Sequence, residues 1–452
     1  MKRLIMASAL AYAACGAEPG NTPILSEPVV NDPKTAATVE PTFASGAPES
    51  AVSALVESGN VFAVSLYKAA SGEPGNTIVG AVSVSAALAL LYPGADGKTA
   101  QEIADVTGFD SVSAEGFAET MGTLLGTLET HIAPGEPGTV FDIDDRSTWN
   151  LPPDPAADLS IANAAWVKDS LRLQADYANT LLSSFAAPTV PIDFGDPVSA
   201  AARINGWVEE RTNDRIKDLV PPDAIDPSLT AMILTNAVWF KANWADPFNP
   251  ELTEDGTFTG RGGTEMPATM MADEMQLRLL ERDGVAVAAL PYSNPDFRLE
   301  VYLPGELEAF EAQLSPARLA ELSRDLSALG TTDVDIRFPK FKVDGEIRLK
   351  PALQAMGLEA AFDPDRASFP RMIEGVAGDD LYVSDAFHKT FFQVDEASTE
   401  AAAATALVVN TESARLTRPF HVDRPFFTVL RHVPTDTVLF LGRIEEVEPF
   451  EG

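Results

Sequence analysis

Hydrophobic positions along the chain recur with two different periods, and this pattern predicts an α+β protein. Apolar residues with helical spacing predict helices at residues 51–66, 84–92, 99–107, 198–211 and 315–322. Runs rich in β-branched and aromatic residues predict strands at residues 162–167, 231–240, 285–290, 298–303, 334–338, 390–395, 425–430 and 438–443. The elements alternate irregularly, which favours a mixed α+β arrangement over repeating βαβ units.

One segment between two predicted strands, from Glu396 to Ala406, consists almost entirely of small residues. Read as a helix, it has the high intrinsic propensity of alanine, but it is short for an isolated helix and has no amphipathic stripe. Read as a strand, it has one wholly small or apolar face: Thr399, Ala401, Ala403, Thr405, Leu407 and Val409. Such a face can cover a packed core without desolvating a charge. Both interpretations stay open at this point.

The N-terminus has the pattern of an export signal. Two basic residues precede an apolar stretch from Leu4 to Ala14, and Cys15 follows directly. Cys15 is the only cysteine, and its position resembles the lipobox of bacterial lipoproteins, although Tyr12 departs from that motif. The alternatives are lipid attachment at Cys15, which would hold the protein at a membrane, and plain secretion. In either case we expect an exported protein, secreted or lipid-anchored at the cell surface.

Composition divides the rest of the chain. We expect residues 1–15 to be the signal, residues 16–50 a disordered linker rich in Gly, Pro, Ser and Thr, and residues 51–450 one folded domain. Residues 133–159 form an acidic, proline-rich insert without the glycine and closing glutamate of a calcium-binding EF-hand, so a solvated loop is favoured. The net charge of −35 argues against nucleic acid as a partner and otherwise indicates a solvated acidic surface.

The chain offers few candidates for catalysis. It has four histidines, none of them in a His-Glu-x-x-His zinc motif, and it has no Gly-x-Ser-x-Gly nucleophile elbow and no phosphate-binding glycine loop. His388 precedes a predicted strand, where a structural, hydrogen-bonded role is favoured over catalysis. We therefore expect a protein that is not an enzyme and that uses no metal and no cofactor.

Several further motifs occur in order between about Ala51 and Phe450. They are Asn163-Ala164-Ala165-Trp166-Val167, Asn205-Gly206-Trp207-Val208, the segment 234–244, Phe338-Pro339-Lys340-Phe341-Lys342, Phe387-His388-Lys389 and Arg424-Pro425-Phe426. Together with Val394-Asp395-Glu396 and the small residues that follow, they resemble the motifs of the serpin family. The resemblance covers nearly the whole chain after the linker.

The resemblance implies the serpin fold, a single domain with a large central β-sheet, surrounding helices and an exposed reactive-centre loop, here at residues 396–418. It also implies a serine-type endopeptidase inhibitor that acts as a suicide substrate. In this family the target protease cleaves the loop, and the loop then inserts into the sheet as a new strand while the acyl-enzyme persists. Strain released on cleavage drives the insertion and distorts the protease.

Carried over by residue, the resemblance places a hinge at the start of the loop. Glu396 opens the hinge, Thr399 is the first residue to insert, and Ser398 stands where the family usually has glycine. Because serine is small, insertion is still expected. The inserting stretch is Glu400, Ala401, Ala402, Ala403, Ala404 and Thr405.

The resemblance also identifies residues around the opening of the sheet. Ser83, Asn236 and His388 match the polar residues of the serpin shutter, but Gly80-Ala81 replace the usual Ser-Pro pair, so we expect an altered hydrogen-bond network. Trp244 matches the tryptophan of the breach, where the loop enters the sheet.

Family spacing counted from Glu396 places the scissile bond between Glu412 and Ser413, with Arg415 as the alternative for a trypsin-like protease. A glutamate at this position requires a protease with a basic specificity pocket. We expect the partner to be a serine protease, in preference to a cysteine protease. We expect the inhibitor itself to be a monomer. The competing function is a noninhibitory serpin that acts as a carrier or binding module.

Overall fold

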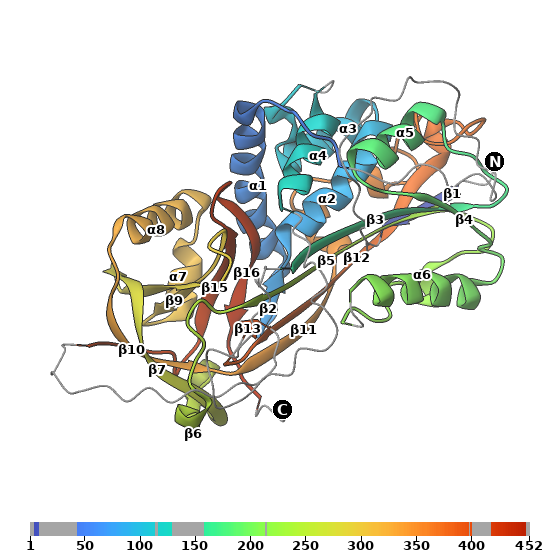
Figure 1. The fold of residues 1–452 in the computed structure, drawn as a ribbon. Helices are drawn as coiled ribbons and strands as arrows, with labels where there is room; N and C mark the ends of the chain where they lie inside the picture. Colours follow the sequence, from blue (N-terminus) through green and yellow to red (C-terminus); the bar gives the residue numbers. More distant parts are fainter. Residues whose placement is uncertain are drawn as a thin grey trace, which may run out of the picture.

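The computed structural model describes residues 4–8, 43–113, 116–128, 158–212, 215–396, 398–399 and 417–448. Several helices cover two β-sheets (Figure 1). The helices are α1 (Glu49–Ala70), α2 (Ala81–Leu91), α3 (Gly97–Thr107), α4 (Phe117–Leu128), α5 (Ala175–Ser184), α6 (Pro197–Arg211), α7 (Leu307–Gln313), α8 (Pro316–Ala328) and α9 (Leu349–Ala355).

The larger part of the candidate site lies on a seven-stranded sheet, called here the central sheet. Its spatial order is β11 (Phe341–Arg348), β12 (Leu381–Val394), β1 (Leu4–Ser8), β5 (Thr230–Asn243), β3 (Asp158–Lys168) and β4 (Thr189–Ile192), and β13 (Ser398–Thr399) also pairs with β5. Strand β1 runs parallel to both of its neighbours, β12 and β5. The outer pairs β11–β12 and β3–β5 are antiparallel.

A nine-stranded second sheet packs beside the central sheet. Its order is β14 (Arg418–His421), β10 (Thr332–Pro339), β7 (Glu265–Arg282), β8 (Val285–Pro291), β9 (Phe297–Pro304), β15 (Phe426–His432), β16 (Thr437–Ile444) and β2 (Thr77–Val79), with β6 (Glu254–Thr259) paired to β7. Helix α7 packs on β9, and α8 packs on β7 and β8 (Figure 1).

The central sheet is covered on both faces. Helices α2 to α5 lie on one face and α6 lies on the other (Figure 1). Side chains alternate along each strand, so Ala165 and Leu234 belong to the large core, while their neighbours Trp166 and Ile233 pack in a smaller core under α6. A strand added between β5 and β12 would therefore be sandwiched between two packed layers.

Hydrophobic periodicity located about half of these elements. Each predicted helix and strand lies within or overlaps an observed one, as for the strand predicted at 231–240 and observed as β5. The sequence did not reveal α4, α5, α7, α9, β1, β2, β4, β6, β7, β11 or β14. Strand β7 alternates exposed and buried positions over much of its length, so its core-facing residues are diluted by polar ones.

The described structure includes short parts of the segments next to the expected folded domain. Phe43 pairs with Phe185 across a β-bridge, so ordered structure begins before residue 51. Part of the expected export signal, residues 4–8, forms β1 in the central sheet. The end of the expected insert, from Asp158, already belongs to β3. The folded unit therefore takes in segments that composition had assigned to signal, linker and insert.

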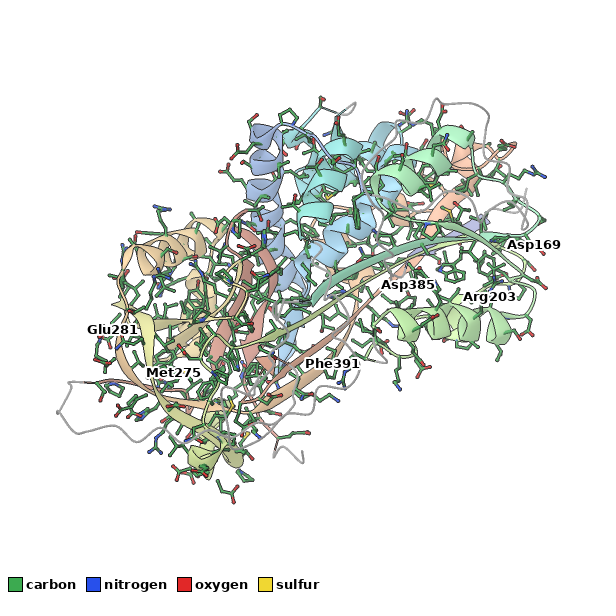
Figure 2. The ribbon with its side chains drawn as sticks, in the orientation of Figure 1. Asp169, Arg203, Met275, Glu281, Asp385 and Phe391 are labelled. Atoms are coloured by element: carbon green, nitrogen blue, oxygen red, sulfur yellow. The ribbon has the colours of Figure 1, made fainter. Side chains whose placement is uncertain are left out.

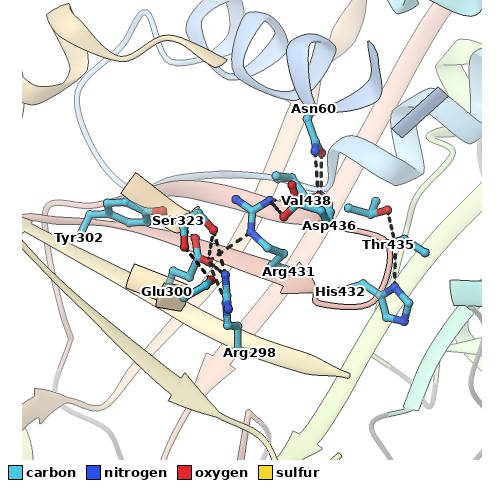
Figure 3. A network of polar contacts seen from close by, with 12 residues as sticks. Asn60, Arg298, Glu300, Tyr302, Ser323, Arg431, His432, Thr435, Asp436 and Val438 are labelled. Atoms are coloured by element: carbon cyan, nitrogen blue, oxygen red, sulfur yellow. Dashed lines mark hydrogen bonds and ion pairs between the residues drawn. The ribbon is translucent and has the colours of Figure 1, made fainter. Parts of the chain in front are cut away.

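A buried ion cluster holds the second sheet together (Figure 3). The Glu300 carboxylate, fully buried, accepts hydrogen bonds from Arg298, Arg431, Ser323 and the Tyr302 hydroxyl. Burial alone raises the pKa of Glu300, but the guanidinium groups of Arg431 and Arg298 outweigh it and hold the pKa at about 2. The cluster ties β9 to β15 and, through Ser323, to α8.

Candidate functional site

Strand β12 leads directly into the expected hinge, and an aromatic pair marks the end of the strand. The Trp244 indole Nε1 donates a hydrogen bond to the Asp395 carbonyl oxygen at 2.9 Å. The Trp244 ring is stacked on Tyr292, with ring centroids 4.6 Å apart. Both rings are buried, so the position of the backbone just before Glu396 is fixed by packing as well as by a hydrogen bond.

Glu396 is held at both its backbone and its side chain. Its carbonyl oxygen accepts a hydrogen bond from Phe248 N at 2.9 Å. One carboxylate oxygen lies 2.8 Å from Lys340 Nζ, and the other accepts a hydrogen bond from the Thr253 hydroxyl at 2.9 Å. The ion pair is partly shielded, with 16% and 15% of the two side chains exposed, so water screens it less than an open surface pair. Glu396 thus anchors the start of the loop.

Beyond the anchor, the chain has already turned back onto the sheet. Ser398 and Thr399 form β13, which pairs antiparallel with β5 so that Ser398 lies opposite Asn243 and Thr399 opposite Ala242. The first inserting position expected from the sequence therefore lies beside the strand it would join. Glu400, the stretch Ala401 to Thr405 and the reactive-site candidates Glu412, Ser413 and Arg415 lie outside the described residues, as does Cys15.

Under the middle of the central sheet, two of the expected shutter residues contact each other. The Ser83 hydroxyl donates a hydrogen bond to Asn236 Oδ1 at 2.7 Å, and Asn236 Nδ2 donates to Asn163 Oδ1 at 3.0 Å. Asn163 Nδ2 in turn donates to the Phe185 carbonyl oxygen. All three side chains are buried, and each hydrogen bond gives a partner to a polar group that would be costly to leave unpaired. This series of hydrogen bonds links α2, β5 and β3.

His388 belongs to a separate hydrogen bond. Its Nε2 accepts from the Gly80 backbone N–H at 3.0 Å, which connects β12 to the start of α2. A Cβ at position 80 would lie 3.3 Å from His388 Cε1 and 3.1 Å from the Phe440 ring, so glycine permits this close approach. The hydrogen-bond donor to His388 is therefore the backbone N–H of Gly80.

The buried imidazole gives the site a titratable group. Burial lowers the pKa of His388 from 6.5 to about 4, because a charged ring would lose its hydration. A neutral ring can accept the Gly80 N–H, whereas protonation at Nε2 would remove the acceptor. His388 is therefore neutral in the folded protein at physiological pH.

We expect acid to destabilise the protein through His388. The unfolded chain binds a proton below about pH 6.5 and the folded chain only near pH 4, so stability present above pH 6.5 is lost between these values, by about 3 kcal/mol at most. Urea unfolding midpoints measured from pH 7 to pH 4 test this. His388→Gln keeps an acceptor for Gly80 but has no charge to gain, so its midpoint should fall less over this range. Equal slopes in both proteins would contradict the role of His388.

The segment that follows α6 crosses the central sheet near β12. Lys389 Nζ donates a hydrogen bond to the Lys217 carbonyl oxygen at 3.0 Å. The Arg215 guanidinium and Lys342 Nζ lie 5.3 Å and 5.1 Å from the centre of the Phe391 ring. Phe391 is on the part of the sheet next to α6 (Figure 2). These contacts hold the segment against β12, beside β11.

The sequence nominated Glu396, Trp244, Ser83, Asn236 and His388 as site residues, but it did not indicate the residues that they contact. Lys340 and Asn163 lie in motifs that pointed to the family, yet the motifs did not indicate which residue each would bind. Thr253, Gly80 N–H and the Lys217 carbonyl oxygen carried no signal, because a backbone donor or a distant hydroxyl has no sequence pattern.

Among the described residues, no group of three or more His, Cys, Asp or Glu side chains is arranged to hold a metal ion. Within the same parts of the chain, none of the helices combines the length and the apolar character needed to cross a membrane.

Comparisons with known proteins identify the family. The model of the serpin (serine protease inhibitor) family matches residues 57–447. Mouse antithrombin-III is 30% identical over 442 residues, covering 95% of this chain and 90% of that protein. A serine protease inhibitor from the jellyfish Cyanea capillata is 31% identical, covering 82% of this chain and 93% of its own. The chain belongs to the serpin family.

A solved structure agrees with this assignment. Human thyroxine-binding globulin, in a complex with thyroxine, has a TM-score of 0.73 and 26% identity, covering 88% of this chain and 99% of its own. The expected α+β serpin fold, a single domain with a large central sheet, is therefore confirmed. Most serpins inhibit proteases, whereas some, such as thyroxine-binding globulin, do not. Family membership alone therefore does not determine whether this chain is an inhibitor, which depends on its reactive loop.

Proposed function

We propose that this chain inhibits a serine protease as a suicide substrate. The observation that carries the proposal is β13: Ser398 and Thr399 already pair with the end of β5, directly after the anchored Glu396. The loop therefore has a defined entry point and a defined register from which to extend. The small residues that follow, from Ala401 to Thr405, add no bulky or charged side chain to the inserting face.

The proposed reaction uses the catalytic residues of the protease. The protease serine attacks the carbonyl carbon of Glu412, the bond to Ser413 breaks, and the new amino terminus of Ser413 takes up the proton and leaves. The cleaved loop, joined to the protease by an ester, then extends β13 along β5. Each residue added gains backbone hydrogen bonds to the sheet that the free loop lacks. Movement of the attached protease distorts its active site before water can hydrolyse the ester.

The second candidate function is that of a noninhibitory carrier. It is favoured by the likeness to human thyroxine-binding globulin, a serpin solved in a complex with thyroxine. Ser398, in place of the usual hinge glycine, also points in this direction, because serine has less backbone freedom. We favour inhibition because β13 has formed on β5 with serine in its sequence.

Complex formation decides between the two functions. The chain is incubated with serine proteases specific for Glu, Arg or hydrophobic residues, and the products are separated on a denaturing gel. An inhibitor gives a one-to-one complex that survives denaturation with at least one protease. A carrier gives only cleaved product, and cleavage then leaves its thermal midpoint unchanged, whereas loop insertion raises it.

We expect Glu412→Arg to change which protease is trapped. A basic specificity pocket that pairs with glutamate repels arginine, so inhibition of a Glu-specific protease should fall by about a hundredfold, and a trypsin-like protease should gain inhibition. The association rate with each protease measures the change, and the mass of the released C-terminal peptide locates the bond. Arg415→Ala is the matched control. If Arg415→Ala, made in the otherwise natural chain, abolishes inhibition of trypsin-like proteases, these proteases cleave after Arg415.

We also propose that the protein is exported, with lipid attached at Cys15 or with secretion as the alternative. The support is the basic start, the apolar stretch and the small residues before Cys15. The mass of the mature N-terminus, compared with that of a Cys15→Ser variant, distinguishes the alternatives. A mature chain that begins with a modified Cys15 supports lipidation.

A further inference from the structure

The seam between β5 and β12, which the reactive loop would enter, already contains a strand from the other end of the chain. Strand β1 pairs in parallel with β12, from Leu4 opposite Leu381 to Ser8 opposite Ala386. It also pairs in parallel with β5, where Ile5 lies opposite Thr230 and Ser8 opposite Leu234. The N-terminal segment thus fills the half of the seam that lies farthest from β13.

The register of β13 shows which part of the seam the loop needs. Ser398 lies opposite Asn243 and Thr399 opposite Ala242, so each residue forward along the loop corresponds to one residue back along β5. Continued without a bulge, this register brings Leu407 to Leu234, Val409 to Met232 and Thr411 to Thr230. In the structure, these three residues of β5 already pair with residues of β1, namely Ser8, Met6 and Ile5.

Strand β5 cannot serve both partners at these positions. Its other edge is already paired with β3, since Met232 lies opposite Val167 and Leu234 opposite Ala165. A strand has only two edges for backbone hydrogen bonds, so the last part of the inserting loop and β1 exclude each other. Insertion up to about residue 406 is compatible with β1, and insertion up to Thr411 is not.

The sequence of β1 suits this position. A parallel strand covered on both faces is expected to be a continuous apolar run, and Leu-Ile-Met-Ala-Ser contains no charge. The segment also lies within the stretch that the sequence predicts to be removed as an export signal. The seam between β5 and β12 is therefore blocked as long as the signal segment is attached, and it is open once that segment is removed.

We propose that residues 4–8 are an autoinhibitory strand that keeps the unprocessed chain from completing loop insertion. This inference rests on the proposed inhibitory function. In the unprocessed chain a protease cleaves the loop, but insertion stops where β1 begins, and the ester is hydrolysed to leave cleaved product and active protease. Removal of the N-terminal segment opens the full length of the seam. The chain would then trap proteases only after export.

The test uses the full-length chain, with residues 1–15 verified by intact mass. Ile5→Asp/Ala7→Asp places two charges in β1, where their desolvation opposes docking. Ala11→Asp/Ala13→Asp makes the same charge change in the same apolar stretch outside β1. With a protease that the processed chain traps, the fraction of cleaved chains that end in complex should rise about tenfold for the first variant, as expected if about nine of ten natural chains have an occupied seam and the variant frees it. It should stay unchanged for the second.

Hydrogen exchange supplies a readout that does not depend on inhibition. Amides of residues 230–234 should be protected in the full-length chain, exchange faster in Ile5→Asp/Ala7→Asp, and regain protection when a synthetic peptide of residues 2–10 is added. Equal ratios of product to complex for all chains, or exchange that does not differ, would overturn the proposal. If neither the full-length nor the processed chain forms a complex, inhibition fails, while the exchange data still decide whether β1 occupies the seam.

Discussion

Thr399→Arg is expected to convert the inhibitor into a substrate. Position 399 lies opposite Ala242 of β5, whose side chain is buried, and alternation predicts that Thr399 belongs to the inserting face of the loop. An arginine there must give up its hydration as the strand enters. A cost of about 3 kcal/mol, well within the range for an unpaired buried charge, shifts the outcome from complex to cleaved product by about a hundredfold.

Glu400→Arg is the matched control for this prediction. It introduces the same side chain one residue away, on the face opposite to that of Thr399, where the natural chain already carries the charge of Glu400. Both variants are titrated against a fixed amount of a protease that the natural chain traps, and the stoichiometry of inhibition is measured. Thr399→Arg should leave nearly all of the protease active while Glu400→Arg still inhibits. Full inhibition by Thr399→Arg would show that the loop does not enter the sheet in the register of β13.

The fold could be predicted from the sequence where a segment has one dominant environment. Strand β5, buried on both faces, is a nearly continuous apolar run, and α2 is apolar all around because it lies in the core, so both were found. Helices α7 and α9 are only seven residues each, too short for a 3.6-residue period to stand out. Packing on neighbours, which the sequence does not display, stabilises such short elements.

The limits are clearer still for individual polar residues. Thr99 and Glu102 have the spacing of a capping box, but they do not cap helix α3. Helix α3 begins at Gly97, Thr99 accepts a hydrogen bond from Ser368 N, and Glu102 accepts from Glu359 N and Ala360 N. Both side chains contact a segment more than two hundred residues away, which local spacing cannot reveal. The pairing of Glu396 with Lys340 escaped the sequence for the same reason.

The N-terminal segment shows how two interpretations of one pattern can both matter. A short apolar run without charges satisfies the requirements of an export signal, and it equally satisfies those of a buried parallel strand. The sequence suggested only the first, because nothing in the run indicates a partner. The partners, β5 and β12, become evident only when the seam between them is seen to have room for a strand.

Glu300→Gln is expected to cause a large loss of stability. Glu300 is fully buried and balances two guanidinium groups, that of Arg431, with 2% of its side chain exposed, and that of Arg298, with 10%. Glutamine keeps the shape of the side chain but removes its charge. Its NH2 group is a donor, and it would face other hydrogen-bond donors. Arg298 then has no carboxylate, while Arg431 retains only Asp436. Breaking a buried pair in this way costs about 3–5 kcal/mol.

Urea unfolding of the natural chain and of Glu300→Gln measures this loss, with Glu254→Gln as the control. Glu254 pairs with Arg337 in the open, where 58% and 47% of the side chains are exposed, so the control should lose less than about 1 kcal/mol. The pKa of Glu300 is lowered from 4.5 to about 2, so its stabilisation is complete above pH 4.5 and is lost as the pH falls toward 2. The difference between the natural chain and Glu300→Gln should therefore shrink in that range, below the interval in which His388 titrates. A difference that stays constant down to pH 2 would mean that the Glu300 charge does not stabilise the cluster.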